Sequence, residues 1–300
     1  MRALITGGGG FVGGHLSAHL AAKGDDVASV DRECDVTDLE AVRAVLTASR
    51  PEVVYHLAAL THVGDSWTNQ SEFTRVNVLG TKNVLDAARS VVPDACVIFV
   101  SSSEVYGIVE ERDLPLDETF RTAPANPYSS SKLEAERFAK EAHRATGQRV
   151  IIARPFNHVG PGQSTRFFVP GLVERLFEAA EEGRTEIGVG DLSTRRDFSD
   201  VRDVVRAYRL LHLHGRGGEV YNVASGHDAA VLDIAQQLRD EIAPGVDLVV
   251  DPALLRPVEV PVTRGSFDKI HDVTGWEPEI ALVTSLHDVV EDFRQRHIVR

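Results

Sequence analysis

The amino-acid sequence predicts an α/β fold in which a doubly wound parallel sheet is joined to a smaller α/β lobe. Two observations support this prediction. Short apolar segments alternate with segments of helical periodicity up to about residue 155, and this alternation is typical of parallel strands connected by helices. A glycine-rich turn also separates the first strand from the first helix, and turns of this kind hold phosphates in doubly wound sheets.

The composition is that of an ordinary globular protein. The 300 residues are 43% hydrophobic and 26% charged, enough for one large domain or two coupled ones. The net charge of -13 argues against a nucleic-acid partner. Cys34 and Cys96 lack the spacing of metal ligands, so we expect no metal site and a reducing compartment. Residues 1–6 lead directly into a strand and no apolar run could span a membrane, so we expect a cytoplasmic protein without a membrane partner.

The first strand and first helix enclose the glycine-rich turn. The strand is expected at Ala3–Ile5 and the helix from Phe11 to about Lys23. Gly7, Gly10 and Gly13 between them have the spacing G-x-x-G-x-x-G. Glycines allow a tight turn and let backbone amides approach a pyrophosphate at the helix amino end. An ordinary turn is the alternative, but the flanking strand and helix favour a dinucleotide site.

The second strand is expected at Val27–Val30, and Asp31 follows it, eighteen residues after Gly13. An acidic side chain here can accept hydrogen bonds from the adenosine ribose of NAD and repel the 2′-phosphate of NADP. Arg32 comes next and could instead hold that phosphate. The sequence therefore favours NAD(H) and leaves NADP(H) open.

The connection after Asp31 is short, because three residues separate it from the segment Asp35–Asp38. If this segment serves the cofactor, Asp35 and Val36 lie beside the adenine ring. The alternative is a short acidic connection that caps the helix expected near Leu39.

Further strands are expected at residues 53–59, 97–100 and 150–153, with a helix running through Asn77 towards Arg89. Ligands of doubly wound sheets bind beyond the carboxyl ends of the strands. The residues that fall at this edge are the glycine-rich turn, Ala58, Ala59, Ser102 and Tyr128.

Tyr128 and Lys132 lie four residues apart at the start of a predicted helix, so their side chains share one helical face. A phenol titrates at about 10 in isolation. A lysine cation one turn away would stabilise the phenolate and bring its pKa towards the working range. The pair is a candidate general acid/base for carbonyl–alcohol chemistry, although the same spacing is common on solvated helix faces.

Together these motifs resemble the extended short-chain dehydrogenases/reductases that act on nucleotide sugars, along nearly the whole chain. The resemblance implies a Rossmann sheet and a Ser–Tyr–Lys triad at Ser102, Tyr128 and Lys132. The serine would hold the substrate oxygen, the tyrosine would transfer its proton, and the lysine would lower the tyrosine pKa and hold the nicotinamide ribose. Asn77 would position structure or water behind the lysine. The implied cofactor-binding residues are Gly7, Gly10, Phe11, Val12, Gly13, Asp31, Arg32, Asp35, Val36, Leu57, Ala58, Ala59, Asn77, Tyr128, Lys132 and Pro155.

The second half of the chain resembles the substrate side of this family. Its motifs are the crossover at 154–163, the arginine doublet in 195–198, and the segment 255–261, which is similar to the Arg-Pro-x-Glu segment of enzymes that handle GDP-linked sugars. A helix beginning at Val169 could meet phosphate with its amino end. A solvated arginine pair and an exposed proline-rich loop are the alternatives for the last two motifs. The substrate-binding residues that the resemblance implies are Asn157, Val169, Arg196, Arg256 and Glu259.

Within the family the chain is most similar to the GDP-6-deoxy-D-mannose reductases, which implies reduction of the C4 ketone of a GDP-linked 6-deoxyhexose by NAD(P)H to give GDP-6-deoxy-D-mannose (GDP-D-rhamnose). GDP-mannose 4,6-dehydratases share much of the pattern but typically carry Thr in place of Ser102, and they need a glutamate, whose place Glu104 takes. Ser102 and the short connection after Asp31 favour the reductase. The dehydratase and a 4-epimerase stay open, whereas Tyr128 and Lys132 argue against a non-enzymatic cofactor-sensing protein.

The resemblance also implies the domain organisation. Residues 1–155 and 196–223 would form the NAD(P)-binding domain, and residues 156–195 and 224–300 the substrate-binding lobe, with the nucleotide sugar between them. A homodimer is expected through the helices near 70–89 and 128–145.

Overall fold

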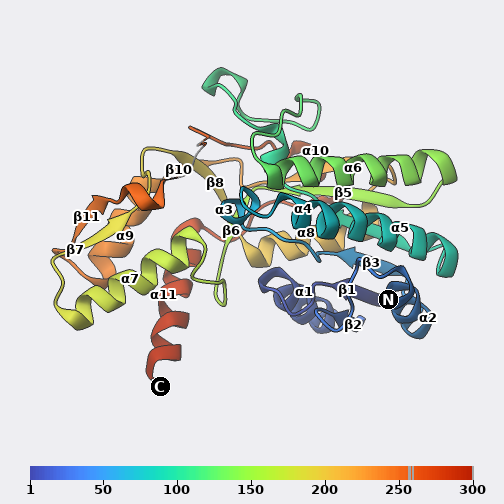
Figure 1. Ribbon diagram of the computed structural model, residues 1–300, viewed down its shortest axis with the longest axis horizontal. Coiled ribbons are helices and arrows are strands. Elements are labelled where there is room, and N and C mark those ends of the chain that lie inside the picture. Colours follow the sequence, from blue (N-terminus) through green and yellow to red (C-terminus); the bar gives the residue numbers. More distant parts are fainter. Residues whose placement is uncertain (256–257, 259, 299–300) are drawn as a thin grey trace.

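The computed structural model describes residues 1–255, 258 and 260–298, without the side chains of residues 297 and 298. Its larger part is a six-stranded parallel sheet with helices on both faces (Figure 1). The strands in spatial order are β2 (Asp26–Val30), β1 (Arg2–Thr6), β3 (Val53–His56), β4 (Cys96–Val100), β5 (Val150–Pro155) and β9 (Val220–Val223). The predicted doubly wound α/β fold is confirmed.

The strand order identifies the ligand-binding edge of this sheet. It reverses at β1, which pairs with β2 on one side and with β3 on the other. Such a reversal opens a crevice at the carboxyl ends of the strands. The short connection of residues 32–38 forms turns instead of a further strand, so β2 remains the edge strand. Asp38 caps α2 (Leu39–Ser49) by accepting from the first amides of that helix.

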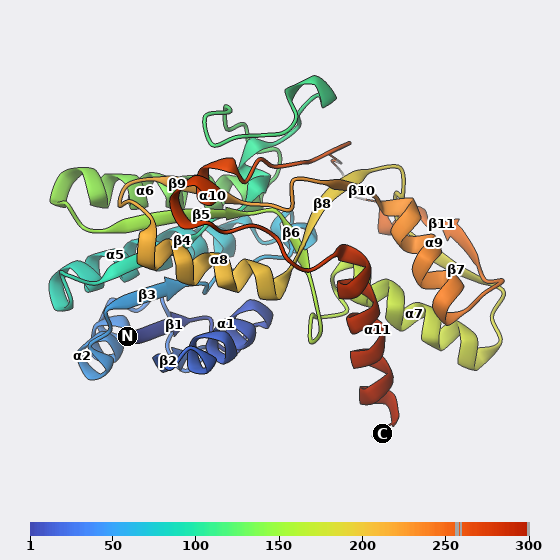
Figure 2. The same cartoon turned by 180° about the vertical axis from the view of Figure 1, so that it is seen from behind.

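Alternate residues along the strands face opposite sides of the sheet. Ile5 and Ile98 belong to a core shared with α1 (Phe11–Ala22) and α8 (Val201–His214). Leu4 and Val97 belong to a second core, shared with α2, α5 (Gly80–Val91) and α6 (Pro127–Thr146). Figure 2 shows α8 lying in front of the sheet when the molecule is seen from behind. Because both faces are covered, the ends of the strands are the accessible part of the sheet.

Two elements differ from the prediction. β3 ends at His56 rather than at residue 59. The helix through Asn77 begins earlier than expected, since α4 (Gln70–Phe73), a π-helical stretch at Thr74–Leu79 and α5 follow one another without a break. Asn77 lies inside the π-helical stretch, a wider turn that is frequent at functional sites.

The smaller lobe contains two short sheets, at the left of Figure 1. One is formed by β10 (Asp228–Ala230), β8 (Arg195–Asp200) and β6 (Asn157–Val159), and the other by β11 (Asp247–Val250) and β7 (Glu186–Val189). An apolar core joins these strands to α7 (Phe168–Glu182), α9 (Val231–Ile242) and α11 (Leu282–Ile298). Short helices lie at α3 (Val63–Ser66), Ser103–Tyr106, Glu111–Asp113 and Pro252–Leu254.

The chain passes between the two lobes several times. The predicted boundary at 195/196 falls inside β8, which pairs only within the small lobe among the described strands. α10 (Asp268–Thr274) and Trp276 pack into the core of the large sheet, and α11 then returns to the small lobe. The domain boundaries themselves stay a prediction. Across the part of the chain that the structure describes, we find no helix with the length and apolarity needed to cross a membrane.

Candidate active site

The glycine-rich turn after β1 lies directly against its neighbours. Gly7 has a φ of +76°, and a Cβ atom there would lie 2.7 Å from the backbone nitrogen of Ala58. A Cβ atom on Gly13 would lie 2.3 Å from the carbonyl oxygen of Gly7. Only glycine fits these positions. The turn therefore brings its backbone, without side chains, to the crevice between β1 and β3.

The amino end of α1 faces this turn. Gly10 is the N-cap and supplies no side-chain cap, and Phe11 and Val12 begin the helix. The first amides of a helix attract anions, because they lack intrahelical partners and lie at the positive end of the helix dipole. A pyrophosphate is the ligand that such a turn and helix end suit best.

Asp31 lies beside the glycine-rich turn. A Cβ atom on Gly9 would meet the Asp31 Oδ2 atom at 2.5 Å, so the carboxylate reaches over the turn. Arg32 is exposed. This arrangement is the one that the predicted contact between Asp31 and the adenosine ribose requires.

Asp35 and Val36 lie farther along the short connection. The Asp35 carboxylate accepts a 2.9 Å hydrogen bond from the amide of Thr37 and pairs with Arg75 at 3.5 Å. The Val36 side chain is 6% exposed and packs against Gly80, where a Cβ atom would lie 2.7 Å from it. Val36 thus belongs mainly to the core. Only the small exposed part of its side chain could make the predicted contact with adenine.

Helix α6 begins at the ligand edge of the sheet. Asn126 caps the helix by accepting from the amide of Ser129, and Pro127 occupies the first turn. Tyr128 follows and is 7% exposed. Burial raises the pKa of Tyr128 to about 12, a side-chain hydrogen bond with Ser102 opposes the rise, and the nearby charge of Glu104 adds to it. The phenol therefore holds its proton at neutral pH and lies beside the Ser102 hydroxyl.

Lys132 lies one turn farther along α6 and is 4% exposed. Its Nζ atom donates a 2.7 Å hydrogen bond to the carbonyl oxygen of Val100, at the end of β4. Burial lowers the pKa of Lys132 to about 8, although the charge of Glu136 raises it. The predicted lowering of the Tyr128 pKa by this lysine differs from what the structure shows, since burial dominates and the ammonium is directed to a carbonyl.

Asn77 is 1% exposed and uses its whole amide. Its Oδ1 atom accepts from the amide of Leu60 at 2.8 Å, and its Nδ2 atom donates to the carbonyl oxygen of Leu60 at 3.0 Å and to the Ser131 Oγ atom at 2.9 Å. Asn77 therefore fastens the segment after β3 to α6 next to Lys132. Its predicted role behind the lysine is a structural one in this arrangement.

Glu104 lies close to the triad. Its Oε2 atom accepts a 3.0 Å hydrogen bond from the Nδ2 atom of Asn126, the residue that caps α6. The amide of Glu104 also donates to the Ser102 Oγ atom at 3.2 Å. The structure thus brings together Ser102, Glu104, Tyr128 and Lys132, while their catalytic roles stay predictions.

The remaining predicted residues lie where β5 leads into the small lobe or beyond it. Pro155 ends β5 and pairs with Val223, and Asn157 is half-buried on β6. Val169 is 2% exposed in the core of the small lobe, so a ligand could meet only its backbone. Arg196 is half-buried, and its guanidinium donates to the carbonyl oxygen of Arg195 at 3.0 Å. Arg256 and Glu259 lie outside the described residues.

Three residues that support the triad, Ser101, Glu136 and Arg154, are not among those predicted from the sequence. Glu136 is 0% exposed and its carboxylate accepts from Ser101 Oγ at 2.6 Å, Arg154 Nε at 2.8 Å and Arg154 Nη2 at 2.7 Å. Burial opposes ionisation, but the Arg154 contacts hold the pKa of Glu136 below its ordinary range. Its position four residues after Lys132, on the same helix face, was the available signal.

Asp197 is a second buried carboxylate, next to Arg196. It accepts from the amide and hydroxyl of Ser225 at 2.8 and 2.7 Å, from the amide of Gly226 at 3.2 Å and from the amide of Gly265 at 3.1 Å. Burial raises the pKa of Asp197 to about 6, and these hydrogen bonds only partly oppose the rise. Asp197 joins β8 to the segment after β9 and to the chain that leads into α10.

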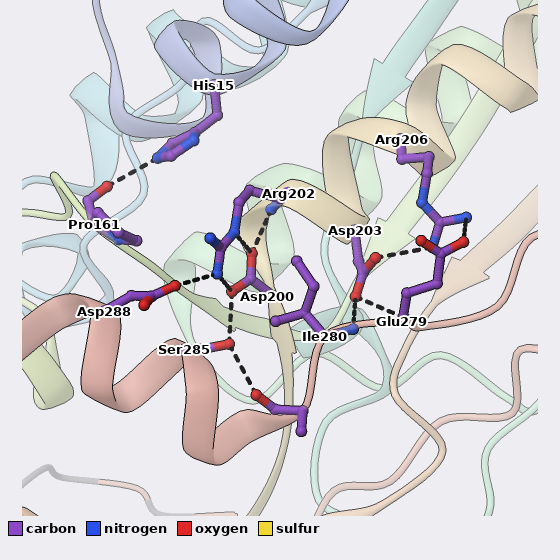
Figure 3. A network of polar contacts seen from close by, with 11 residues as sticks. His15, Pro161, Asp200, Arg202, Asp203, Arg206, Glu279, Ile280, Ser285 and Asp288 are labelled. Carbon is purple, nitrogen blue, oxygen red and sulfur yellow. Dashed lines mark hydrogen bonds and ion pairs between the residues drawn. The ribbon is translucent and has the colours of Figure 1, made fainter.

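The crossover loop after β6 is held from both lobes (Figure 3). His15 on α1 contacts the carbonyl oxygen of Pro161 at 2.8 Å. Asp200, the N-cap of α8, accepts from Arg202 at 2.7 Å and from the Ser285 hydroxyl at 2.6 Å, and Arg202 also reaches Asp288 on α11 at 2.7 Å. These contacts of Asp200 and Arg202 join α8 to α11. The loop itself is held to α1 through His15 and to α11 through the amide of Gly162, which donates to Asp292 at 2.9 Å.

The residues at this edge fit a nicotinamide dinucleotide. The glycine turn offers a cradle that a Cβ atom would fill, α1 offers an open amino end, and Asp31 lies where a ribose would follow. When bound, such a cofactor supplies hydride transfer. Ser102 and Tyr128 offer two adjacent hydroxyl groups, which suit the oxygen of a carbonyl substrate.

Comparisons with known proteins agree with this geometry. The model of the NAD dependent epimerase/dehydratase family matches residues 3–224. The GDP-6-deoxy-D-mannose reductase of Pseudomonas aeruginosa strain PAO1 is 37% identical, over 98% of each chain. The GDP-6-deoxy-D-talose 4-dehydrogenase of Aggregatibacter actinomycetemcomitans is 30% identical, over 100% of this chain and 99% of its own. The solved structure of RMD from Pseudomonas aeruginosa, complexed with NADPH, is similar with a TM-score of 0.90 and 35% identity, covering 99% of this chain and 100% of its own.

Proposed function

The chain belongs to the NAD dependent epimerase/dehydratase family, and we propose that it reduces the C4 ketone of GDP-4-dehydro-6-deoxy-D-mannose with NAD(P)H. The product is GDP-6-deoxy-D-mannose. The reductase of Pseudomonas aeruginosa, 37% identical over nearly the full length of both chains, supports this activity. The chain is thus an NAD(P)-dependent oxidoreductase of nucleotide sugars.

The observation that carries the proposal is the placement of the buried Tyr128 phenol beside the Ser102 hydroxyl, at the ligand edge of the sheet. Burial raises the pKa of Tyr128 to about 12, so the phenol holds a proton at neutral pH that it can donate. Reduction of a ketone needs such a donor, because negative charge develops on the C4 oxygen as the hydride is delivered. Ser102 donates a hydrogen bond to the same oxygen and stabilises that charge. The Glu104 carboxylate helps to keep the proton on Tyr128.

The test is a turnover assay with the purified chain. The GDP-4-keto-sugar is mixed with NADH or with NADPH, and the absorbance of the reduced cofactor is followed. We expect one reduced cofactor to be consumed for each sugar. No loss of absorbance with either cofactor would contradict the proposal. Comparison of the product with GDP-6-deoxy-D-mannose and with its C4 epimer gives the stereochemistry at C4. This centre distinguishes the sugars of the two relatives, 6-deoxy-D-mannose and 6-deoxy-D-talose.

A GDP-mannose 4,6-dehydratase is the second candidate, because Glu104 lies near enough to raise the pKa of Tyr128. A dehydratase needs a base at the sugar C5 position, and Glu104 could serve. Incubation with GDP-mannose and NAD separates the two candidates. Formation of the 4-keto-sugar without net change in the cofactor would favour the dehydratase, whereas the reductase leaves GDP-mannose unchanged.

The proposal extends to the cofactor preference, the assembly and the compartment. The Asp31 carboxylate beside the glycine turn favours NADH over NADPH. A homodimer is proposed through α4, the π-helical stretch, α5 and α6, where Val78 and Leu79 of the π-helical stretch and Phe138 of α6 line an apolar cavity of about 350 Å³. The buried free thiols Cys34 and Cys96 are consistent with action in the cytoplasm.

A further inference from the structure

The buried face of α6 carries a third polar residue beyond the predicted pair. Tyr128, Lys132 and Glu136 follow one another at intervals of four residues and are 7%, 4% and 0% exposed. Side chains at this spacing lie on one helix face, about one turn apart. A fully buried carboxylate is rare unless it is paired, so the burial of Glu136 needs a structural explanation.

Lys132 and Glu136 hold the last residue of β4, Val100, and the residue that follows it, Ser101. Lys132 Nζ donates to the carbonyl oxygen of Val100 at 2.7 Å, and the Ser101 hydroxyl donates to Glu136 Oε1 at 2.6 Å. The next residue of the chain is Ser102, whose hydroxyl lies beside the Tyr128 phenol. Two successive turns of α6 therefore fasten the backbone directly before Ser102.

Glu136 also holds the next strand. Arg154 on β5 is 2% exposed and binds both oxygens of the Glu136 carboxylate, at 2.8 and 2.7 Å. The amide of Ser101 donates to the carbonyl oxygen of Ala153 at 2.8 Å, so β4 and β5 are joined at the same level. Arg154 lies three residues before Asn157, where the chain enters the small lobe. One carboxylate thus ties α6, β4 and β5 together at the ligand edge.

We propose that Glu136 is a positioning residue for the reduction, which fixes Ser102 against Tyr128 through its contacts with Ser101 and Arg154. This inference rests on the proposed function. It extends the catalytic group by a residue that touches neither substrate nor cofactor.

Among the groups around Lys132, Glu136 is the charged side chain that affects the pKa of the lysine. His56 on β3 also faces the ammonium, but burial lowers the pKa of His56 to about 3, so its ring is neutral at assay pH. The Phe99 ring on β4 lies 5.2 Å from Lys132 Nζ and carries no charge. Burial lowers the pKa of Lys132 to about 8, and Glu136 opposes that effect. Loss of the Glu136 charge is therefore expected to neutralise Lys132 at a lower pH.

The experiment compares four variants with the wild-type chain by turnover, by the pH profile of kcat and by thermal unfolding. Ser101→Ala removes the hydrogen bond that the Ser101 hydroxyl donates to the Glu136 carboxylate. Glu136→Gln removes the charge but leaves Arg154 unpaired and could unfold, so Glu136→Gln/Arg154→Met removes both charges together. Lys140→Met is the matched control, because Lys140 reaches the same carboxylate at 3.3 Å from a side chain that is 46% exposed.

We expect kcat to fall about tenfold in Ser101→Ala and in the double variant, with KM for the sugar unchanged within about twofold, because small displacements of a catalytic hydroxyl slow the chemical step. The alkaline limb of the kcat profile should move about one unit to lower pH in the Glu136 variants only. Lys140→Met should match the wild type in both measurements. Folded Ser101→Ala and double variants with wild-type kcat and an unmoved alkaline limb would overturn the inference, because a merely structural role changes unfolding alone.

A measurement without turnover separates this inference from the proposed function. The chain has five lysines, so the Lys132 resonance can be identified in a lysine side-chain carbon NMR spectrum by comparison with Lys132→Met. The Lys132 titration midpoint should be lower in the double variant than in the wild type. If the wild type fails to oxidise either reduced cofactor with the keto-sugar, the proposed function fails, and this titration still decides the effect of Glu136 on Lys132.

Discussion

Each lobe contains a fully buried carboxylate, and the two are held in opposite ways. Glu136 in the large lobe and Asp197 in the small lobe are both 0% exposed. Glu136 accepts hydrogen bonds from the Arg154 guanidinium, from the Lys140 ammonium and from one hydroxyl. Asp197 accepts from three amides and one hydroxyl, all of them neutral.

The difference shows that the number of hydrogen bonds does not decide whether a buried carboxylate is ionised. Burial works against ionisation at both sites. At Glu136 the Arg154 contacts outweigh it and the pKa is lowered, whereas at Asp197 burial outweighs the neutral donors and the pKa rises to about 6. A cationic partner compensates for the lost hydration of a buried anion far better than amide dipoles do. The large lobe therefore holds a permanent charge next to the triad, and the small lobe holds one that titrates.

The largest effect should come from the proposed triad, which lies in the large lobe. Tyr128→Phe removes the proton donor, so kcat should fall about 10³-fold. The dissociation constant of the reduced cofactor, measured by fluorescence titration, should stay within about twofold. A variant that keeps most of its turnover would break the assignment of proton transfer to Tyr128.

The next effect concerns the stability of the large lobe. Glu136→Gln leaves the Arg154 charge buried without a counter-ion, which should lower the free energy of unfolding by about 3–5 kcal/mol at pH 7. Urea unfolding followed by circular dichroism measures the change. Lys140→Met is the control and should cost less than about 0.5 kcal/mol, since its ion pair is half exposed. A decrease in the free energy of unfolding of less than about 1 kcal/mol for Glu136→Gln would mean that the ion pair between Glu136 and Arg154 contributes little to stability.

The third effect distinguishes Glu136 from Asp197 by the pH dependence that each gives to the free energy of unfolding. The folded pKa of Asp197 is about 6, above its ordinary value of 3.8, so the folded chain binds this proton more tightly than the unfolded chain does. Above about pH 6 the ionised Asp197 carboxylate therefore lowers the free energy of unfolding by about 3 kcal/mol. This loss of stability disappears as the pH falls towards 4.

Asp197→Asn cannot titrate, so its comparison with the wild type isolates this term. The wild type should gain stability relative to Asp197→Asn between pH 7 and pH 4, as measured by urea unfolding at each pH. Glu136 has the opposite sign: its lowered pKa adds stability above its ordinary range, and this stability is lost as the pH falls below that range. A constant difference between wild type and Asp197→Asn would contradict the raised pKa.

The smallest effect is expected at the surface of the large lobe, where water screens the charges. Asp31→Ala removes the carboxylate beside the glycine turn, so the ratio of kcat/KM for NADPH to that for NADH should rise about tenfold. Arg32→Ala should change the ratio in the opposite direction if Arg32 holds a 2′-phosphate. Initial rates with both cofactors measure the ratio. An unchanged ratio in both variants would mean that neither Asp31 nor Arg32 determines the preference between NADH and NADPH.

The sequence predicted the parts of the fold and site that depend on short-range patterns. Gly7 and Gly13 are visible because the turn they form is local, and Tyr128 and Lys132 are visible because helix geometry relates residues four apart. The direction of the Lys132 ammonium could not be predicted, because its acceptor is Val100, on another element. The groups that set the Glu136 and Asp197 pKa values, such as the Arg154 guanidinium and the Gly265 amide, lie on other elements of the fold. Only the folded structure shows that one carboxylate meets a guanidinium and the other meets amides.

The repeated passage of the chain between the lobes has a consequence for how the protein can be divided. After β5 the chain enters the small lobe, returns for α8 and β9, leaves for β10 and α9, comes back for α10 and ends in α11. No single cut of the polypeptide separates the two lobes, so neither could be produced alone as a truncated fragment. The lobes should instead melt in one cooperative transition, and proteases should find few internal sites that release a folded half. Exchange of one lobe between relatives would therefore require several segments to be grafted together, and could not be made by joining two segments end to end.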